Sequence, residues 1–144
     1  NTLYLDATDY DEENNFGDIV TAGEYKTEEL QRIPADIFKK YFEEVPGKPG
    51  YHHLVEKIRR RVFFKYNNLL NLEPVGSDYS LIVCKNVLLH FSYEQRIEVI
   101  KMYHRSLAPG GYLATENTQK MPEEIAHLFE QVTQDAQLFR KIGG

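Results

Sequence analysis

Apolar residues gather in strand-length runs at several places along the chain. The run Tyr-Ser-Leu-Ile-Val-Cys at residues 79–84 is apolar almost throughout, which is typical of a central strand covered on both faces of a parallel sheet. Four further segments are predicted to be extended: residues 3–9, 51–66, 112–115 and 136–142. The second of these has Val62, Phe63 and Phe64 as its expected core.

Between these runs, apolar residues recur at helical spacing. Ser92 with Gln95 three residues later forms a capping box, which is a typical helix start. Pro109-Gly110-Gly111 ends the helix that follows. Shorter helices are predicted at residues 27–33, 34–45 and 121–129. Because strands and helices alternate, the chain is predicted to form an α/β sheet.

The composition indicates a folded protein but does not identify a reaction. The 144 residues are 42% apolar and 12% aromatic, which is enough for a folded core and argues against disorder. The net charge of −5 gives no general attraction to nucleic acid or to anionic membranes. The basic cluster Lys57–Arg61 is either a solvated turn or a docking surface for an acidic partner.

The single cysteine and the chain ends bear on location and completeness. Cys84 alone excludes an internal disulfide, fits a reducing compartment and is expected in the core. No apolar run reaches the roughly 18 residues of a membrane span, and no signal peptide opens the chain, so we expect a cytoplasmic protein. The chain starts at Asn1 without a methionine and closes on Gly143-Gly144, so we expect it to be part of something longer.

Three local patterns follow one another in the sequence. Residues 4–11 (Tyr-Leu-Asp-Ala-Thr-Asp-Tyr-Asp) end a strand in acidic residues, and Asn-Asn-Leu-Leu at 67–70 follows an extended segment. Residues 81–91 (Leu-Ile-Val-Cys-Lys-Asn-Val-Leu-Leu-His-Phe) join the buried strand to the capped helix, which ends in Leu-Ala-Pro-Gly-Gly-Tyr-Leu at 107–113. In this order and spacing they resemble the CheR family, which methylates glutamate side chains of bacterial chemoreceptors.

The resemblance covers nearly the whole chain and implies a fold. Residues 23–42 are similar to the stretch before the family's accessory subdomain, and residues 129–141 to its closing β-hairpin. The implied fold is α/β: a Rossmann-like class I methyltransferase sheet flanked by helices, mostly parallel with a C-terminal antiparallel hairpin, and truncated at the N-terminus. Residues 1–144 are then a partial catalytic domain, with residues 24–66 as a reduced accessory subdomain region.

The resemblance also implies that one segment is missing. The family's first strand, glycine-rich turn and helix cradle the methionyl part of the cofactor, and they should lie before Asn1. That strand belongs at the centre of the sheet, between the strands containing Leu5 and Ile82, and a sheet without it has open edges. Either upstream residues or another chain, such as a second copy in a homo-oligomer, would fill the gap.

The cofactor that the resemblance implies is S-adenosylmethionine, held at the carboxyl ends of parallel strands. The family pattern assigns Asp9 to the ribose hydroxyls, from which a carboxylate accepts hydrogen bonds. It assigns Asn68 and Leu69 to adenine, as an amide partner and an apolar wall. From the residues alone, Asp9 is equally well a turn-forming aspartate, and Asn68 a structural residue of a turn.

Lys85, Asn86 and His90 follow the buried strand at residues 79–84, where a parallel sheet places ligand contacts. The family usually has arginine at the position of Lys85, and lysine keeps the charge without the planar fork. His90 stands where the family typically has a tyrosine near the transferred methyl group, and we predict it as the catalytic residue. It could orient an acceptor carboxylate, act as a base for another acceptor, or merely pack under the following helix.

The predicted function is an S-adenosylmethionine-dependent methyltransferase acting on a protein acceptor of the chemoreceptor kind or on another carboxylate. The short stretch Pro46–Gly50 leaves little length for the subdomain that can dock the receptor tail in the family, so the acceptor stays open. The alternative is a degenerate, non-catalytic domain of the same fold that senses the cofactor or binds a protein. An oxidoreductase is less favoured because no Gly-x-Gly-x-x-Gly occurs, and no metal is expected because His52-His53 lacks further ligands.

Overall fold

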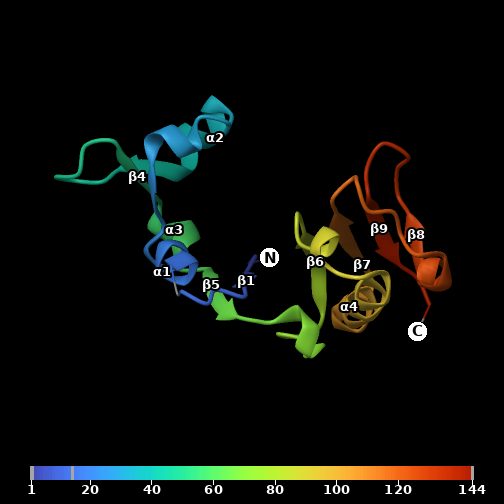
Figure 1. Cartoon of the computed structure of the whole chain (residues 1–144). Helices are drawn as coiled ribbons and strands as arrows, with labels where there is room; N and C mark the ends of the chain where they lie inside the picture. Colours follow the sequence, from blue (N-terminus) through green and yellow to red (C-terminus); the bar gives the residue numbers. More distant parts are fainter. Residues whose placement is uncertain (1, 14, 144) are drawn as a thin grey trace. The chain divides into compact units, whose positions relative to one another are not determined.

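The computed structural model describes residues 2–13 and 15–143. Its chain divides into two compact units, Asn1–Asn68 and Leu69–Gly144. Figure 1 colours the first unit from blue to green and the second from yellow-green to red. None of the helices in the described ranges has the length and apolar character needed to cross a membrane.

The first unit holds a parallel strand pair and a small antiparallel sheet. Its elements are β1 Leu5–Asp9, α1 Asn15–Ala22, β2 Glu24–Lys26, η1 Thr27–Leu30, α2 Ala35–Tyr41, β3 Phe42–Glu44, β4 Tyr51–Leu54, α3 Glu56–Arg59 and β5 Val62–Tyr66. Strand β1 runs parallel to β5, and β4 lies between β2 and β3, antiparallel to both. The region predicted as an accessory subdomain thus contains a three-stranded sheet of its own.

Helix α1 lies close to β5 because a glycine faces the strand. A Cβ atom on Gly17 would lie 2.9 Å from the ring of Phe64, so a larger side chain would push the helix away. The Asp11 carboxylate caps the helix by accepting hydrogen bonds from the N–H groups of Asn15 (3.1 Å) and Gly17 (3.0 Å). The sequence patterns did not predict this helix, which is short and follows a polar stretch.

The prediction of one extended segment at residues 51–66 is wrong. Helix α3 separates β4 from β5, and an ion pair of 2.6 Å between Glu56 and Arg59 spans its single turn. The basic cluster Lys57–Arg61 lies on this helix and on the turn after it. Phe63, expected in the core, is 48% exposed, because successive side chains of a strand point to opposite faces and Phe64 is the one beside α1.

The second unit is a four-stranded sheet with one long helix. Its elements are η2 Leu69–Asn71, β6 Tyr79–Cys84, η3 Leu88–His90, α4 Tyr93–Ser106, β7 Leu107–Thr115, η4 Glu123–Leu128, β8 Phe129–Gln131 and β9 Leu138–Lys141. The strand order is β6-β7-β9-β8; β6 and β7 are parallel, and β9 is antiparallel to β7 and β8. The predicted α/β fold with parallel strands and a closing antiparallel hairpin is confirmed.

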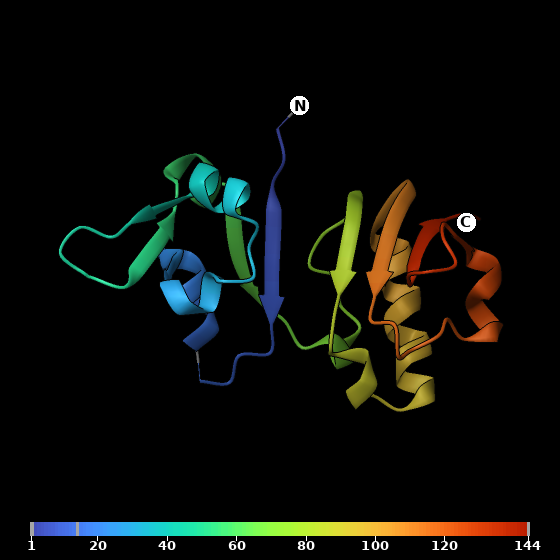
Figure 2. The same ribbon diagram turned by 90° about the horizontal axis from the view of Figure 1, so that it is seen from above.

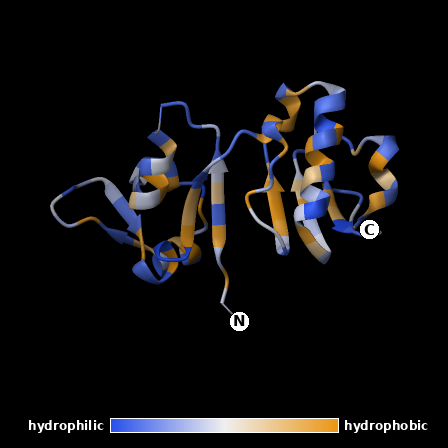
Figure 3. Cartoon of the chain, turned by 90° about the horizontal axis from the view of Figure 1, so that it is seen from below, coloured by the Kyte–Doolittle hydropathy of each residue, from blue (hydrophilic) through white to orange (hydrophobic). Residues whose placement is uncertain are grey.

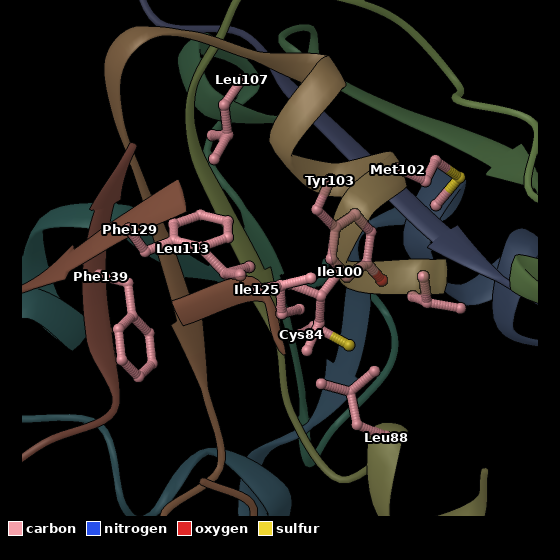
Figure 4. Close-up of a cluster of buried hydrophobic side chains, with 11 residues drawn as sticks. Cys84, Leu88, Ile100, Met102, Tyr103, Leu107, Leu113, Ile125, Phe129 and Phe139 are labelled. Atoms are coloured by element: carbon pink, nitrogen blue, oxygen red, sulfur yellow. The ribbon is translucent and has the colours of Figure 1, made fainter. Parts of the chain in front are cut away.

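Helix α4 begins at the predicted capping box and covers one face of this sheet (Figure 2). The N–H of Ser92 donates to Gln95 Oε1 at 2.9 Å, and the N–H of Gln95 donates to Ser92 Oγ at 3.2 Å. The buried side chains of the helix and the strands form one core, part of which Figure 4 shows. Its members are Cys84, Leu88, Val99, Ile100, Met102, Tyr103, Leu107, Leu113, Ile125, Phe129 and Phe139.

Strand β7 begins earlier than predicted and includes Gly110 and Gly111. Its register to β6 shifts between Tyr79 and Leu81. Gly110 has a φ of 71°, and a Cβ atom on Gly111 would lie 2.8 Å from the carbonyl oxygen of Tyr79. The two glycines were predicted only to end the preceding helix. In the structure they also allow an irregularity within β7.

The other face of β6 and β7 is apolar and exposed. Leu81 and Val83 are 53% and 61% exposed, and Tyr112, the register partner of Leu81, is 39% exposed. Figure 3 colours most of β6 as hydrophobic. Within the described residues β6 pairs only with β7, and β1 only with β5, so both are edge strands of their sheets. Each unit therefore has an open edge on a strand that was expected to flank a missing central strand.

Candidate functional site

The carboxyl ends of β1 and β5 lie side by side in the first unit. The parallel ladder runs from the pair Leu5–Val62 to the pair Asp9–Tyr66. Beyond it, the N–H of Asn67 donates to the carbonyl oxygen of Asp9 at 3.0 Å. This contact brings Asp9 and the segment that leads to Asn68 to the same edge of the strand pair, the edge at which open α/β sheets bind ligands.

Of the three aspartates on β1 and just after it, two are already engaged. Asp6 forms a 2.8 Å ion pair with Lys65, and Asp11 is 5% exposed and caps α1. The Asp9 side chain is exposed, and the described part of the chain supplies it with no side-chain hydrogen bond or ion pair. Of these three aspartates, Asp9 is therefore the one that a ligand can reach.

Asn68 and Leu69, predicted to contact adenine, lie at the end of the first unit and the start of the second. Both side chains are partly buried. Leu69 opens η2 and packs against the apolar core of the second unit. Part of the apolar surface of Leu69 is thus covered by that core, and part of it stays accessible.

The carboxyl ends of β6 and β7 also lie side by side, with Cys84 and Thr115 as register partners. The next residue on β6 is Lys85, whose Nζ donates to the carbonyl oxygen of Thr115 at 2.5 Å. Asn86 follows with a φ of 58°, a left-handed conformation that asparagine adopts more readily than most residues. The chain therefore turns sharply at the end of the strand.

His90 closes the short helix η3 in the same loop. Its N–H donates to the carbonyl oxygen of Val87 at 3.0 Å, and its side chain is exposed. The alternative of a histidine packed under the following helix does not apply in this structure. The structure thus brings Lys85, Asn86 and His90 together in one loop after β6.

Buried polar groups lie beneath this loop, and one of them was missed by the sequence interpretation. Burial raises the pKa of the Cys84 thiol and of the Tyr103 phenol, and each group also influences the pKa of the other. Both stay neutral near pH 7, and Cys84, at 5% exposure, is the core residue that was predicted. The missed residue is Glu116, which directly follows β7 and is 6% exposed; an acidic residue immediately after a strand was the available signal.

The paired histidines, on β4, have partners within the first unit. Nδ1 of His52 is 2.7 Å from Thr27 Oγ1, and Nδ1 of His53 is 2.9 Å from the carbonyl oxygen of Leu54. Across residues 2–13 and 15–143, no three His, Cys, Asp or Glu side chains are grouped so that they could hold a metal ion.

Parallel strands with polar residues at their carboxyl ends are the arrangement with which open α/β sheets bind ligands. Comparison with known families makes this specific: the CheR methyltransferase, SAM binding domain, matches residues 2–138. The chain belongs to the CheR methyltransferase family. The predicted cofactor, S-adenosylmethionine (SAM), is the one named in the description of the matching domain.

Curated relatives agree with this assignment. The chain is 34% identical over 106 residues to chemotaxis protein methyltransferase 1 of Pseudomonas aeruginosa, which covers 71% of this chain and 38% of the relative. It is 31% identical over 105 residues to chemotaxis protein methyltransferase Cher2 of Pseudomonas putida, covering 70% and 38%. The chain thus spans well under half the length of these relatives.

Among solved structures, the chain is similar to the N-methyltransferase NodS from Bradyrhizobium japonicum WM9 in complex with S-adenosyl-l-homocysteine. The TM-score is 0.44 at 18% identity, over 58% of this chain and 56% of the other. The family assignment does not depend on this weak similarity.

Proposed function

We propose that this chain supplies part of an S-adenosylmethionine-dependent methyltransferase that methylates a carboxylate of a protein. The observation that carries the proposal is Asp9: an exposed carboxylate without an engaged side-chain partner, at the carboxyl end of a parallel strand pair, in a chain that matches the CheR domain over residues 2–138. Such a carboxylate fits the two hydroxyls of a ribose, because it can accept a hydrogen bond from each.

The other predicted site residues would contact or face different parts of the ligand. The amide of Asn68 can both donate to and accept from the edge of adenine, and Leu69 adds apolar surface. Lys85 keeps its ammonium group near the end of β6, where its bond to Thr115 restricts its movement. Asn86, in its left-handed conformation, turns the chain so that the loop after β6 faces the ligand side of the sheet.

The chemistry requires alignment more than acid–base catalysis. When bound, S-adenosylmethionine would supply an electrophilic methyl group on a sulfonium, and its transfer to a carboxylate oxygen would leave the sulfur as a thioether. A carboxylate is already a nucleophile and needs no base, so orientation and a polar environment provide the rate enhancement. His90, exposed on its loop, would hold the acceptor carboxylate by a hydrogen bond from its ring N–H.

A protein acceptor is the proposal that the relatives' names support, since they are chemotaxis protein methyltransferases. The antiparallel sheet β2-β4-β3 lies in the region where the family has its accessory subdomain. We propose a chemoreceptor glutamate as the first acceptor to test. The changes at Lys85 and His90 relative to the family pattern leave room for another carboxylate.

The open edges of β1 and β6 support a further part of the proposal. Both strands lack a partner on one side within the described residues, and the exposed Leu81 and Val83 border one of these edges. We propose that a parallel strand and its helix, from residues upstream in a longer protein or from another chain, pair with these edges and cover the apolar face. That added strand and turn would hold the methionyl part of the cofactor.

Calorimetric titration of S-adenosylhomocysteine into this chain tests the cofactor site. The expected result is micromolar binding, weakened about tenfold or more in Asp9→Ala, because each charge-assisted hydrogen bond contributes roughly 1.5–3 kcal/mol. Asp135→Ala is the matched control, since it removes the same charge from an exposed loop residue. Equal affinities of the wild type and Asp9→Ala would contradict the assignment of Asp9.

Two negative outcomes have different meanings. If this chain does not bind but a longer protein carrying the upstream residues does, the added strand is required for the site. If neither binds, the second candidate function is the better one: a non-catalytic domain that acts by protein interaction. The departures at Lys85 and His90 are what favour that candidate, and binding without methyl transfer to receptor peptides would support its cofactor-sensing form.

A further inference from the structure

Glu116 is a buried acid for which neither the core nor the proposed reaction accounts. It directly follows β7 and is 6% exposed. Its Oε1 accepts a hydrogen bond from the N–H of Leu89 at 3.2 Å. Its Oε2 is buried and has no hydrogen-bond partner within the described residues. A buried acceptor left without a partner costs free energy, so a carboxylate at this position needs an explanation other than packing.

Glu116 lies close to two side chains of the core. After burial, which is the largest cause, it contributes to raising the pKa of Cys84 and Tyr103, and Figure 4 shows both of these side chains within the apolar core. An apolar side chain would fill such a place without leaving an oxygen unpaired. The interaction that distinguishes glutamate from an apolar residue here is the hydrogen bond to Leu89.

That hydrogen bond fixes the loop after β6 at its far end. Cys84 and Thr115 are register partners, so Lys85 and Glu116 are the next residues along two adjacent strands. Lys85 ties the near end of the loop to the carbonyl oxygen of Thr115, and Glu116 ties the η3 turn, one residue before His90. Two neighbouring residues at the end of β7 thus hold both ends of a loop that contains Lys85, Asn86 and His90.

We propose that Glu116 is a positioning residue that holds the loop of residues 85–90 in the conformation in which it meets its ligand. The role requires an acceptor oxygen at the reach of a glutamate side chain, and it does not require the negative charge. The inference rests on the proposed function for the identity of the ligand, whereas the hydrogen bond itself can be tested without any ligand.

The test compares three substitutions at this position in the full chain. Glu116→Gln keeps an acceptor oxygen at the same reach and removes the charge. Glu116→Asp keeps the charge and shortens the reach by one methylene, and Glu116→Ala removes both. Glu123→Gln, at an exposed position of η4, is the control for loss of an acidic group elsewhere. Amide hydrogen exchange at residues 88–90, thermal unfolding and the affinity for S-adenosylhomocysteine are measured for each.

The expected result is that Glu116→Gln and the control exchange like the wild type at Leu89. Exchange there should be about tenfold faster in Glu116→Asp and Glu116→Ala, and the affinity for S-adenosylhomocysteine should fall about tenfold in the same two variants. A role in core stability alone would lower the unfolding temperature of Glu116→Ala without a selective change at residues 88–90, and would overturn the proposal.

Two other results would also overturn it. One is wild-type behaviour of Glu116→Asp with loss in Glu116→Gln, which would make the charge the active feature. The other is unchanged exchange in Glu116→Ala. If the wild type does not bind S-adenosylhomocysteine, that result counts against the proposed function, and the exchange data still decide whether Glu116 holds the loop.

Discussion

Asp6, Asp9 and Asp11 are close together in sequence but differ in what their carboxylates contact. Asp6 pairs with Lys65 across the strands, and Asp11 caps α1. Asp9 contacts neither Lys65 nor the start of α1, because it is the last residue of β1 and lies where the strand pair ends. A carboxylate that is free of local partners is the one that can bind a ligand, so the contacts of its neighbours support the role proposed for Asp9.

At the residue scale, Cys84 and Tyr103 lead to a prediction about alkaline pH. Burial raises the pKa of both groups in the folded chain, so above their ordinary pKa values the unfolded chain releases protons that the folded chain retains. Their contribution to stability is complete at neutral pH and is lost as the pH rises. For Tyr103 the expected loss is about 1.4 kcal/mol per pH unit above about pH 10.

Urea unfolding of the wild type and of Tyr103→Phe between pH 8 and pH 11 measures this loss. The variant keeps the ring and lacks the ionisable group, so the free energy of unfolding should fall less steeply with pH than in the wild type. Parallel curves for the two proteins would show that folding does not raise the pKa of Tyr103.

At the scale of the element, helix α4 depends on its first turn. Ser92 and Gln95 satisfy each other's backbone N–H groups there, and the helix carries much of the core of the second unit, including Val99, Ile100 and Met102. Ser92→Ala should therefore lower the free energy of unfolding by about 1 kcal/mol.

Chemical denaturation of the chain measures that change. Ser80→Ala is the control, because Ser80 is exposed on β6 and no helix begins there; its effect should stay within about 0.5 kcal/mol. An effect of Ser92→Ala no larger than that of the control would mean that the capping box adds nothing to the stability of α4.

At the scale of the whole molecule, open edges and an exposed apolar face predict low stability and self-association. β1 and β6 are edge strands over the described residues, and unpaired edges readily pair with other chains. The chain should unfold at a temperature below the range of about 45–65 °C that is usual for such domains, or should associate. Val83→Lys, which places a charge on the exposed face of β6, should reduce association.

Sedimentation velocity and thermal unfolding test this prediction. Thr133→Lys, in the loop between β8 and β9, adds the same charge away from β6 and serves as the control. A wild-type chain that stays monomeric and unfolds well above that range would show that the open edges do not limit its stability.

Local patterns in the sequence were sufficient to determine several features of this protein. The capping box at Ser92 and the strand at residues 79–84 depend on interactions between residues close in sequence or on a single apolar run. The closing hairpin was expected from the family resemblance and not from a local pattern. The strand end at Asp9 and the loop carrying Lys85, Asn86 and His90 were also placed correctly relative to the strands. Their predicted ligand contacts remain predictions.

Other features were decided only by tertiary contacts. Helix α1 depends on the contact of Gly17 with Phe64, far along the chain, and the exposure of Phe63 depends on which face of β5 that helix covers. The role of Glu116 depends on the parallel register that brings it beside the loop after β6. A sequence pattern reports which side chains are apolar or can form a cap, whereas packing between distant segments determines which of them become buried and which polar groups meet.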